Sequence, residues 1–265
     1  MKTKLLAVFN FISVLIAIAT SYFTQAFNLN GNTIGSLSKQ PEYANLFTPA
    51  GYAFAIWGLI YLSLLAFSVF HLIRVFKQGK KEDFLLQTGS KLILANLATS
   101  AWVVAWLYEY TAISVVLMFI ALVALLRIVV VTRMEVWDAP RSIIAFNWWP
   151  ICLYAGWLSV ASIANTAAFL VKIDWQPAIF NEVQYTLIMI IVATIINLAM
   201  IFYRNMREFA AVGIWALVAI YFKQIDNQDS IAYTALIGAI VIALYAAYHG
   251  FKNRKNNPLY RILNS

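Results

Sequence analysis

The sequence predicts an all-α fold, a polytopic transmembrane helical bundle of about eight spans. Its 265 residues are 63% hydrophobic and only 11% charged, with a mean hydropathy of +0.76. Soluble domains carry about a quarter charged residues, so this chain cannot cover a surface that faces water. The apolar runs are long and continuous, whereas the strands of a membrane barrel alternate apolar and polar residues. Helices are therefore the expected spanning elements.

A membrane-spanning helix needs about 20 mostly apolar residues. The first apolar run is longer than the roughly 7–15 apolar residues of a signal peptide, and no clear cleavage site follows it, so we interpret it as a retained span. The seventh run is short enough to suggest a thin span or a re-entrant segment. The eight predicted spans are 5–27, 49–73, 86–108, 111–131, 146–170, 184–203, 208–222 and 230–250.

The distribution of basic residues supports this number of spans. With the N-terminus inside and eight spans, all but three of the 19 Lys and Arg residues lie on the inner side; the exceptions are Lys39, Lys172 and Lys223. This asymmetry is typical of cytoplasmic loops. It predicts cytoplasmic N- and C-termini, and it explains the net charge of +8 without a nucleic-acid partner.

Cysteine and histidine are too few for most cofactor chemistry. The single cysteine, Cys152, excludes a disulfide within the chain, and His71 and His249 are predicted near cytoplasmic helix ends. Di-iron and bis-histidine haem sites need several imidazoles inside the bundle. We therefore expect no cofactor, no metal site and no catalytic residues, so the protein is not predicted to be an enzyme.

The longest predicted outer loop, residues 28–48, is a candidate lid over a binding site, although a plain surface connector fits the sequence equally well. Thr48 followed by Pro49 predicts a helix start, with Thr48 as the N-cap. Pro150 predicts the start of the regular helix in the fifth span. The basic segment 252–265 is expected to be a cytoplasmic tail beside anionic headgroups.

The nine tryptophans are the most informative residues for function. Tryptophan prefers the membrane interface, but four of these residues fall well inside predicted spans, where an indole often borders a cavity. Helical spacing places Phe54, Trp57 and Tyr61 on one face. It places a second stripe on the fifth span, and small residues there allow close helix packing. The deep tryptophans are Trp57, Trp102, Trp157 and Trp215, and the stripe consists of Trp157, Ala161, Ala164 and Ala168.

Two helices resemble the TspO/translocator-protein family, the tryptophan-rich sensory proteins. Residues 49–61, PAGYAFAIWGLIY, are similar to the second helix of that family, and residues 150–165, PICLYAGWLSVASIAN, to its fifth. Asn96 and Trp102 resemble the Asn and Trp of its third helix. The resemblance covers about residues 5–171.

The resemblance implies a five-helix core over 1–171, with three additional helices over 172–251. It also implies a pocket beneath the first outer loop for tetrapyrroles such as porphyrins or for sterols, contact with membrane lipid, and a homodimer. A bacterial inner (plasma) membrane is the expected location. From the resemblance and the helical spacing together, the candidate ligand-binding residues are Pro49, Phe54, Trp57, Tyr61, Asn96, Trp102, Trp157, Ala161 and Asn165.

Two functions remain open from the sequence. The first is binding, sensing or transport of a hydrophobic planar ligand in this aromatic pocket under the loop. The alternative is a secondary transporter that moves a small solute by alternating access, although the sequence shows neither a buried charge pair nor a clear broken helix.

Overall fold

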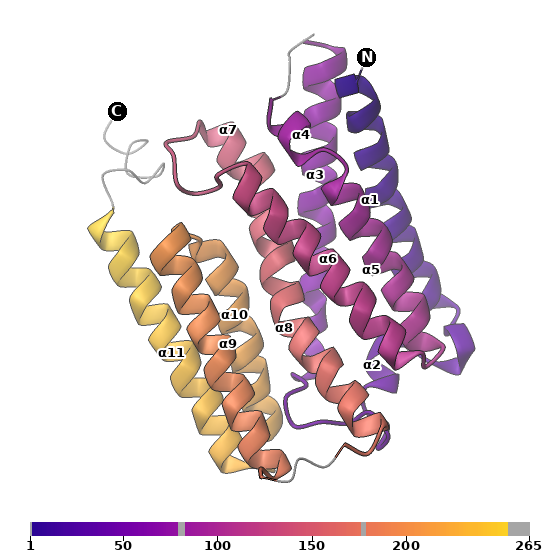
Figure 1. Cartoon of the computed structure of the whole chain (residues 1–265), viewed down its shortest axis with the longest axis vertical. Helices are drawn as coiled ribbons and strands as arrows, with labels where there is room; N and C mark the ends of the chain where they lie inside the picture. Colours follow the sequence, from indigo (N-terminus) through magenta and orange to yellow (C-terminus); the bar gives the residue numbers. More distant parts are fainter. Residues whose placement is uncertain (1, 79–82, 176–178, 254–265) are drawn as a thin grey trace.

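The computed structural model describes residues 2–78, 83–175 and 179–253, and within these ranges every regular element is a helix. Eight helices of 17 to 25 residues run side by side (Figure 1). They are α1 (Lys2–Ala26), α3 (Ile56–Phe76), α5 (Lys91–Leu107), α6 (Thr111–Val131), α8 (Trp149–Lys172), α9 (Glu182–Arg204), α10 (Arg207–Gln224) and α11 (Asp229–Lys252).

The eight predicted spans correspond one by one to these eight helices, and the predicted polytopic bundle is confirmed. Six of them are long and apolar enough to cross a membrane by length and composition: α1, α3 with the turn before it, α6, α8 with the turns before it, α9 and α11. Helix α5 is apolar but has only 17 residues. Helix α10 carries three charged residues among its 18, and it is continuous rather than re-entrant.

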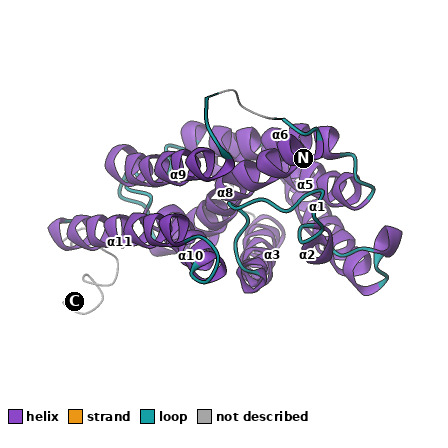
Figure 2. Ribbon diagram, turned by 90° about the horizontal axis from the view of Figure 1, so that it is seen from below, coloured by secondary structure: helices purple, strands orange, loops and turns teal. Residues whose placement is uncertain are grey.

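Helix α8 lies between two groups of helices (Figure 2). On one side α6 packs against α8 and α5, and α1 packs against α5 and α3. On the other side α9, α10 and α11 pack against one another, and α10 also packs along α8. The last three helices are therefore attached to the first five mainly through the contact between α8 and α10.

Glycine allows this contact to be close. A Cβ atom at Gly156 of α8 would lie 2.8 Å from the carbonyl oxygen of Phe209 and 3.1 Å from Cβ of Val212, both in α10. Real Cβ atoms essentially never come that near to another backbone. Membrane helices use small residues in this way because close approach increases van der Waals contact where no hydrophobic effect drives association.

The segments before α3 and α8 depart from regular α-helix. A 3₁₀ turn, η2 (Gly51–Ala55), precedes α3, so the helix start predicted at Thr48 and Pro49 was wrong: both residues lie in the preceding coil, and the N-cap of the turn is Ala50. A short helix, α7 (Arg141–Ile143), and a π-helical turn, η3 (Ile144–Trp148), precede α8. Helix α8 itself begins with proline in its first turn, as predicted from Pro150.

The start of α1 and the end of α11 lie at the same end of the bundle (Figure 1). The segment that joins α1 to η2 lies at the opposite end. It contains a 3₁₀ turn, η1 (Leu29–Gly31), and the short helix α2 (Ile34–Leu37). We call residues 28–50 of this segment the lid. A further short helix, α4 (Asp83–Thr88), precedes α5, and the predicted basic tail lies beyond the described residues from position 254 onward.

Candidate ligand-binding site

A cavity of about 50 Å³ lies beneath the lid, between α5 and α8. Its walls come from three parts of the chain: the lid together with η2, the last turns of α5, and one face of α8. Most of the lining side chains are apolar or aromatic. The lining residues are Ile34, Ser38, Thr48, Pro49, Phe54, Trp102, Trp106, Trp157, Val160, Ala161, Ala164, Asn165 and Ala168.

The α8 wall is the stripe that helical spacing predicted. Trp157, Ala161, Ala164 and Ala168 all border the cavity, because residues three and four apart lie on the same face of an α-helix. Trp157 is 2% exposed, and its ring meets that of Phe54 edge-on with 5.8 Å between centroids. Three alanines beside one indole leave open space under the lid that larger side chains would fill.

Six of the nine candidate residues border the cavity, and three lie behind its wall. Pro49, Phe54, Trp102, Trp157, Ala161 and Asn165 line it, whereas Trp57, Tyr61 and Asn96 do not. Trp57 stacks on Tyr61 and on Trp102, with centroid separations of 5.4 and 6.3 Å. It therefore supports Trp102 from behind.

Phe54 and Trp57 lie in different elements, and only Phe54 borders the cavity. Their spacing of three residues was interpreted as one face of a regular α-helix, but Phe54 lies in η2 and Trp57 in α3.

The two asparagines connect helices. Asn96 of α5 donates from Nδ2 to the Ser13 hydroxyl of α1 at 3.0 Å. Asn165 of α8 donates to the Ser114 hydroxyl of α6 at 3.1 Å, and its Oδ1 accepts from the Trp102 indole at 3.4 Å. All five side chains are buried. Such bonds fix the relative positions of α1, α5, α6 and α8 around the cavity.

The structure adds Trp106 to the predicted wall. It shares a face of α5 with Trp102 and is 4% exposed. The indole N–H groups of Trp106 and Trp157 are buried and have no hydrogen-bond partner among the described residues. A buried donor without an acceptor is unfavourable.

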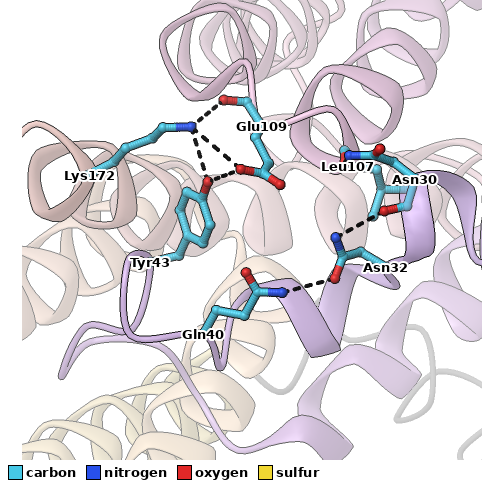
Figure 3. Close-up of polar contacts among 7 residues, drawn as sticks. All are labelled: Asn30, Asn32, Gln40, Tyr43, Leu107, Glu109 and Lys172. Atoms are coloured by element: carbon cyan, nitrogen blue, oxygen red, sulfur yellow. Dashed lines mark hydrogen bonds and ion pairs between the residues drawn. The ribbon is translucent and has the colours of Figure 1, made fainter.

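The lid is held over the cavity by a polar cluster at the ends of α5 and α8 (Figure 3). The Tyr43 hydroxyl donates to Oε2 of Glu109 at 2.6 Å and accepts from Nζ of Lys172 at 3.0 Å. Nζ of Lys172 also donates to the carbonyl oxygen of Glu109 at 2.8 Å and lies 3.9 Å from its carboxylate. We call Tyr43, Glu109 and Lys172 the latch.

Tyr43 joins the latch to the cavity wall. Its side chain is fully buried, and its ring meets the Trp106 ring edge-on at 5.7 Å, with the Lys172 ammonium 5.1 Å from the Tyr43 centroid. Burial, followed by the hydrogen bond to Glu109, raises the pKa of the Tyr43 hydroxyl. The hydroxyl therefore stays protonated and remains a donor to the carboxylate at neutral pH.

The beginning of the lid is attached separately. The Asn30 side chain donates to the carbonyl oxygen of Leu107, the last residue of α5, at 3.0 Å. Within the lid, Gln40 donates to the Asn32 side chain at 3.0 Å (Figure 3). The lid is thus an ordered segment with defined contacts to α5 and within itself.

Sequence reasoning missed the latch. The sequence assigns no role to Glu109, whose side chain is 38% exposed and paired with Lys172. One signal was present, because Lys172 is among the three basic residues predicted on the outer side. Another was the pair of aromatic residues Tyr43 and Phe47 within an otherwise polar loop, both of which are buried.

Comparison with known proteins identifies the family of the chain. The model of the TSPO-like protein family matches residues 7–248, from α1 through most of α11. The match extends past residue 171, where the resemblance to the family was taken to end, and so includes the last three helices. Neither the curated proteins nor the solved structures gave a match. With a family model that covers most of its length and six helices fit to cross a bilayer, the chain is an integral membrane protein that belongs to the TSPO-like protein family.

Proposed function

We propose that the protein binds a hydrophobic planar molecule, of the size class of tetrapyrroles or sterols, in the cavity under the lid. The observation that carries this proposal is the combination of three tryptophans, Trp102, Trp106 and Trp157, with a face of alanines beneath a lid that is bonded in place. Aromatic walls with few polar groups suit flat apolar ligands. Membership of the TSPO-like family supports the same ligand class.

The size of the cavity implies that binding requires a movement. At about 50 Å³ it is much smaller than the roughly 300–1,000 Å³ of ordinary ligand pockets. The α5 and α8 walls belong to long helices fixed by Asn165 and its partners. The lid is held in part by the half-exposed latch, so it is the wall expected to move when a ligand enters.

The two indole donors indicate what the ligand should offer. Trp106 and Trp157 present buried N–H groups without acceptors, while the Trp102 N–H is already bonded to Asn165. A planar ligand that carries a carbonyl or carboxylate oxygen would satisfy one of these donors. A ligand with the same shape and no acceptor is expected to bind more weakly.

Protoporphyrin titration of the purified full-length protein in detergent tests the proposal. Tryptophan quenching should saturate at micromolar ligand. Trp157→Phe, in the cavity wall, should weaken binding about fivefold or more, corresponding to roughly 1 kcal/mol of aromatic contact. Trp149→Phe makes the same change at the other end of α8, where the side chain is 45% exposed, and should leave the affinity unchanged. Linear quenching, or equal effects of the two variants, would refute the site.

Transport by alternating access remains the alternative function. Among the described residues no Asp, Glu, Lys or Arg residue is fully buried. The partly buried charges of Glu135, Arg207 and Glu208 lie in the loop after α6 and at the first turn of α10, so no charge pair in the middle of the bundle supports ion-coupled transport. Flux of a solute in proteoliposomes that follows an imposed ion gradient would favour this alternative. A homodimer, expected from the family resemblance, likewise remains a proposal that a mass measurement in detergent would test.

A further inference from the structure

Helix α10 holds the end of the lid. The Ala50 backbone N–H donates to the Ala219 carbonyl at 3.1 Å, and the Gln224 side chain donates to the Leu46 carbonyl at 2.8 Å. Just after the lid, the Trp215 indole donates to the Ala53 carbonyl at 3.1 Å. Each bond uses a backbone group of the segment 46–53, so the bonds fix the path of the chain as it enters η2.

The bond from Gln224 lies in protected surroundings, whereas the Trp215 side chain is 38% exposed. Gln224 is 2% exposed, and Phe47, next to Leu46, is 1% exposed. Breaking such a bond leaves a buried carbonyl or N–H without a partner, which costs more than losing the same bond in water. The attachment to α10 should therefore survive while weaker contacts of the lid break.

The latch is a weaker attachment. The side chains of Lys172 and Glu109 are 32% and 38% exposed, and their charged groups are 3.9 Å apart. An ion pair at a half-exposed site contributes little stabilising free energy, because water hydrates the two charged groups well when they are apart. Salt weakens the pair further by screening it. The contacts on the two sides of residue 45 therefore differ in kind: uncharged hydrogen bonds to backbone groups of the chain follow it, and a half-exposed ionic cluster precedes it.

We propose that α10 is the fixed anchor of the lid and that the latch is its release point, so that ligand enters where Tyr43 leaves its place beside Trp106. In this arrangement residues 34–43 swing outward while residues 46–53 stay bonded to α10. The proposal gives the last three helices a role, since α10 belongs to them. Only the entry of ligand rests on the proposed function. The opening movement of the lid does not, because it requires no ligand.

Hydrogen exchange of the ligand-free, full-length protein, followed by mass spectrometry, tests this order of events. In the wild type, the amides of Tyr43 and Ala44, which are bonded to the Gln40 carbonyl, should exchange faster than the amide of Ala50. Lys172→Met should accelerate exchange of the peptide 37–44 about two- to tenfold, as expected for losing a half-exposed ion pair and its hydrogen bonds. Exchange at Ala50 should stay unchanged.

Two variants serve as controls. Lys39→Met removes a positive charge from the lid itself, at an exposed residue with no ion pair among the described residues, and should change neither peptide. Gln224→Leu removes the anchor bond to Leu46 and should accelerate exchange in 46–53. Raising the salt concentration should accelerate exchange of 37–44 in the wild type and have little effect in Lys172→Met.

The results separate the proposal from its rivals. If peptides 37–44 and 46–53 exchange together in the wild type, or if Lys172→Met changes nothing, the anchor-and-latch arrangement is wrong. A failed porphyrin titration would overturn the proposed ligand without affecting this result, since no ligand is present. Conversely, a lid that moves as one body would leave saturable porphyrin binding intact.

Discussion

Trp102 and Asn165 are partners of each other: the indole N–H of Trp102 in α5 donates to Oδ1 of Asn165 in α8 at 3.4 Å. Asn165 also exchanges hydrogen bonds with the Ser114 hydroxyl of α6 at 3.1 and 3.2 Å. One side chain thus joins three helices at the wall of the cavity. The polar groups expected to orient a ligand are already used, at least in part, to hold the helices that form the site.

Asn165→Ala should therefore destabilise the protein. Removing the amide breaks the bonds from Asn165 to Ser114 and Trp102, although the Ser114 hydroxyl keeps its bond to the Thr111 carbonyl in its own helix. Interhelical hydrogen bonds in membranes are worth about 0.6 kcal/mol on average and up to about 1.7 kcal/mol. Thermal unfolding in detergent should show a lower midpoint. Thr166→Ala is the matched control, because the Thr166 hydroxyl bonds only to the Ser162 carbonyl in its own helix. If Asn165→Ala unfolds like the wild type and loses only porphyrin binding, Asn165 contacts ligand instead.

The sequence alone predicts the bundle well because its signal is strong. Continuous apolar runs of about 20 residues and the bias of Lys and Arg are properties of each helix by itself. The α8 stripe from Trp157 to Ala168 was predictable for the same reason, since its regular helix keeps the 3.6-residue period throughout. The start of α3 was not, because Pro49 is followed by a 3₁₀ turn that the helical pattern does not reveal.

The lid contacts were beyond prediction because they join residues far apart in the chain. Tyr43 meets Glu109 and Lys172, which lie 66 and 129 positions away. Gln224 meets Leu46 across 178 positions. No local periodicity predicts such pairs. The contact of Gln224 also needs α10 to lie against α8, and Gly156 allows that close approach.

Gly156→Ala should weaken the attachment of the last three helices. The added Cβ would meet the Phe209 carbonyl at 2.8 Å, so α8 and α10 must move apart, and overpacking of this kind costs about 1–3 kcal/mol. Gly58→Ala is the matched control: it lies in α3, and nothing is within 4 Å of the added atom. Thermal unfolding should show a lower midpoint for Gly156→Ala alone. Equal midpoints would mean that the α8–α10 contact can relax.

Tyr43→Phe should speed the release of ligand. The substitution keeps the ring against Trp106 but removes the hydroxyl that bonds Glu109 and Lys172. Losing hydrogen bonds to charged groups at a half-exposed site should accelerate porphyrin dissociation about two- to tenfold in stopped-flow measurements. Tyr110→Phe, at a 60% exposed side chain next to Glu109, should dissociate at the wild-type rate. Unchanged dissociation from Tyr43→Phe would show that the lid does not control release.

Glu135, in the loop after α6, should make stability depend on pH. Burial, followed by the nearby Glu208 carboxylate, raises the pKa of Glu135 from 4.5 to about 8, against the opposing effect of Arg207. The folded protein therefore keeps this proton up to about pH 8, whereas the unfolded chain loses it near its ordinary value. The stabilising contribution of this bound proton is complete below about pH 4.5 and is lost as the pH rises through about 8.

Unfolding midpoints between pH 5 and 9 should fall less steeply for Glu135→Gln than for the wild type. Glu42→Gln, at an exposed lid residue, should keep the wild-type slope, and a wild-type slope in Glu135→Gln would show that this carboxyl is ionised in the folded protein.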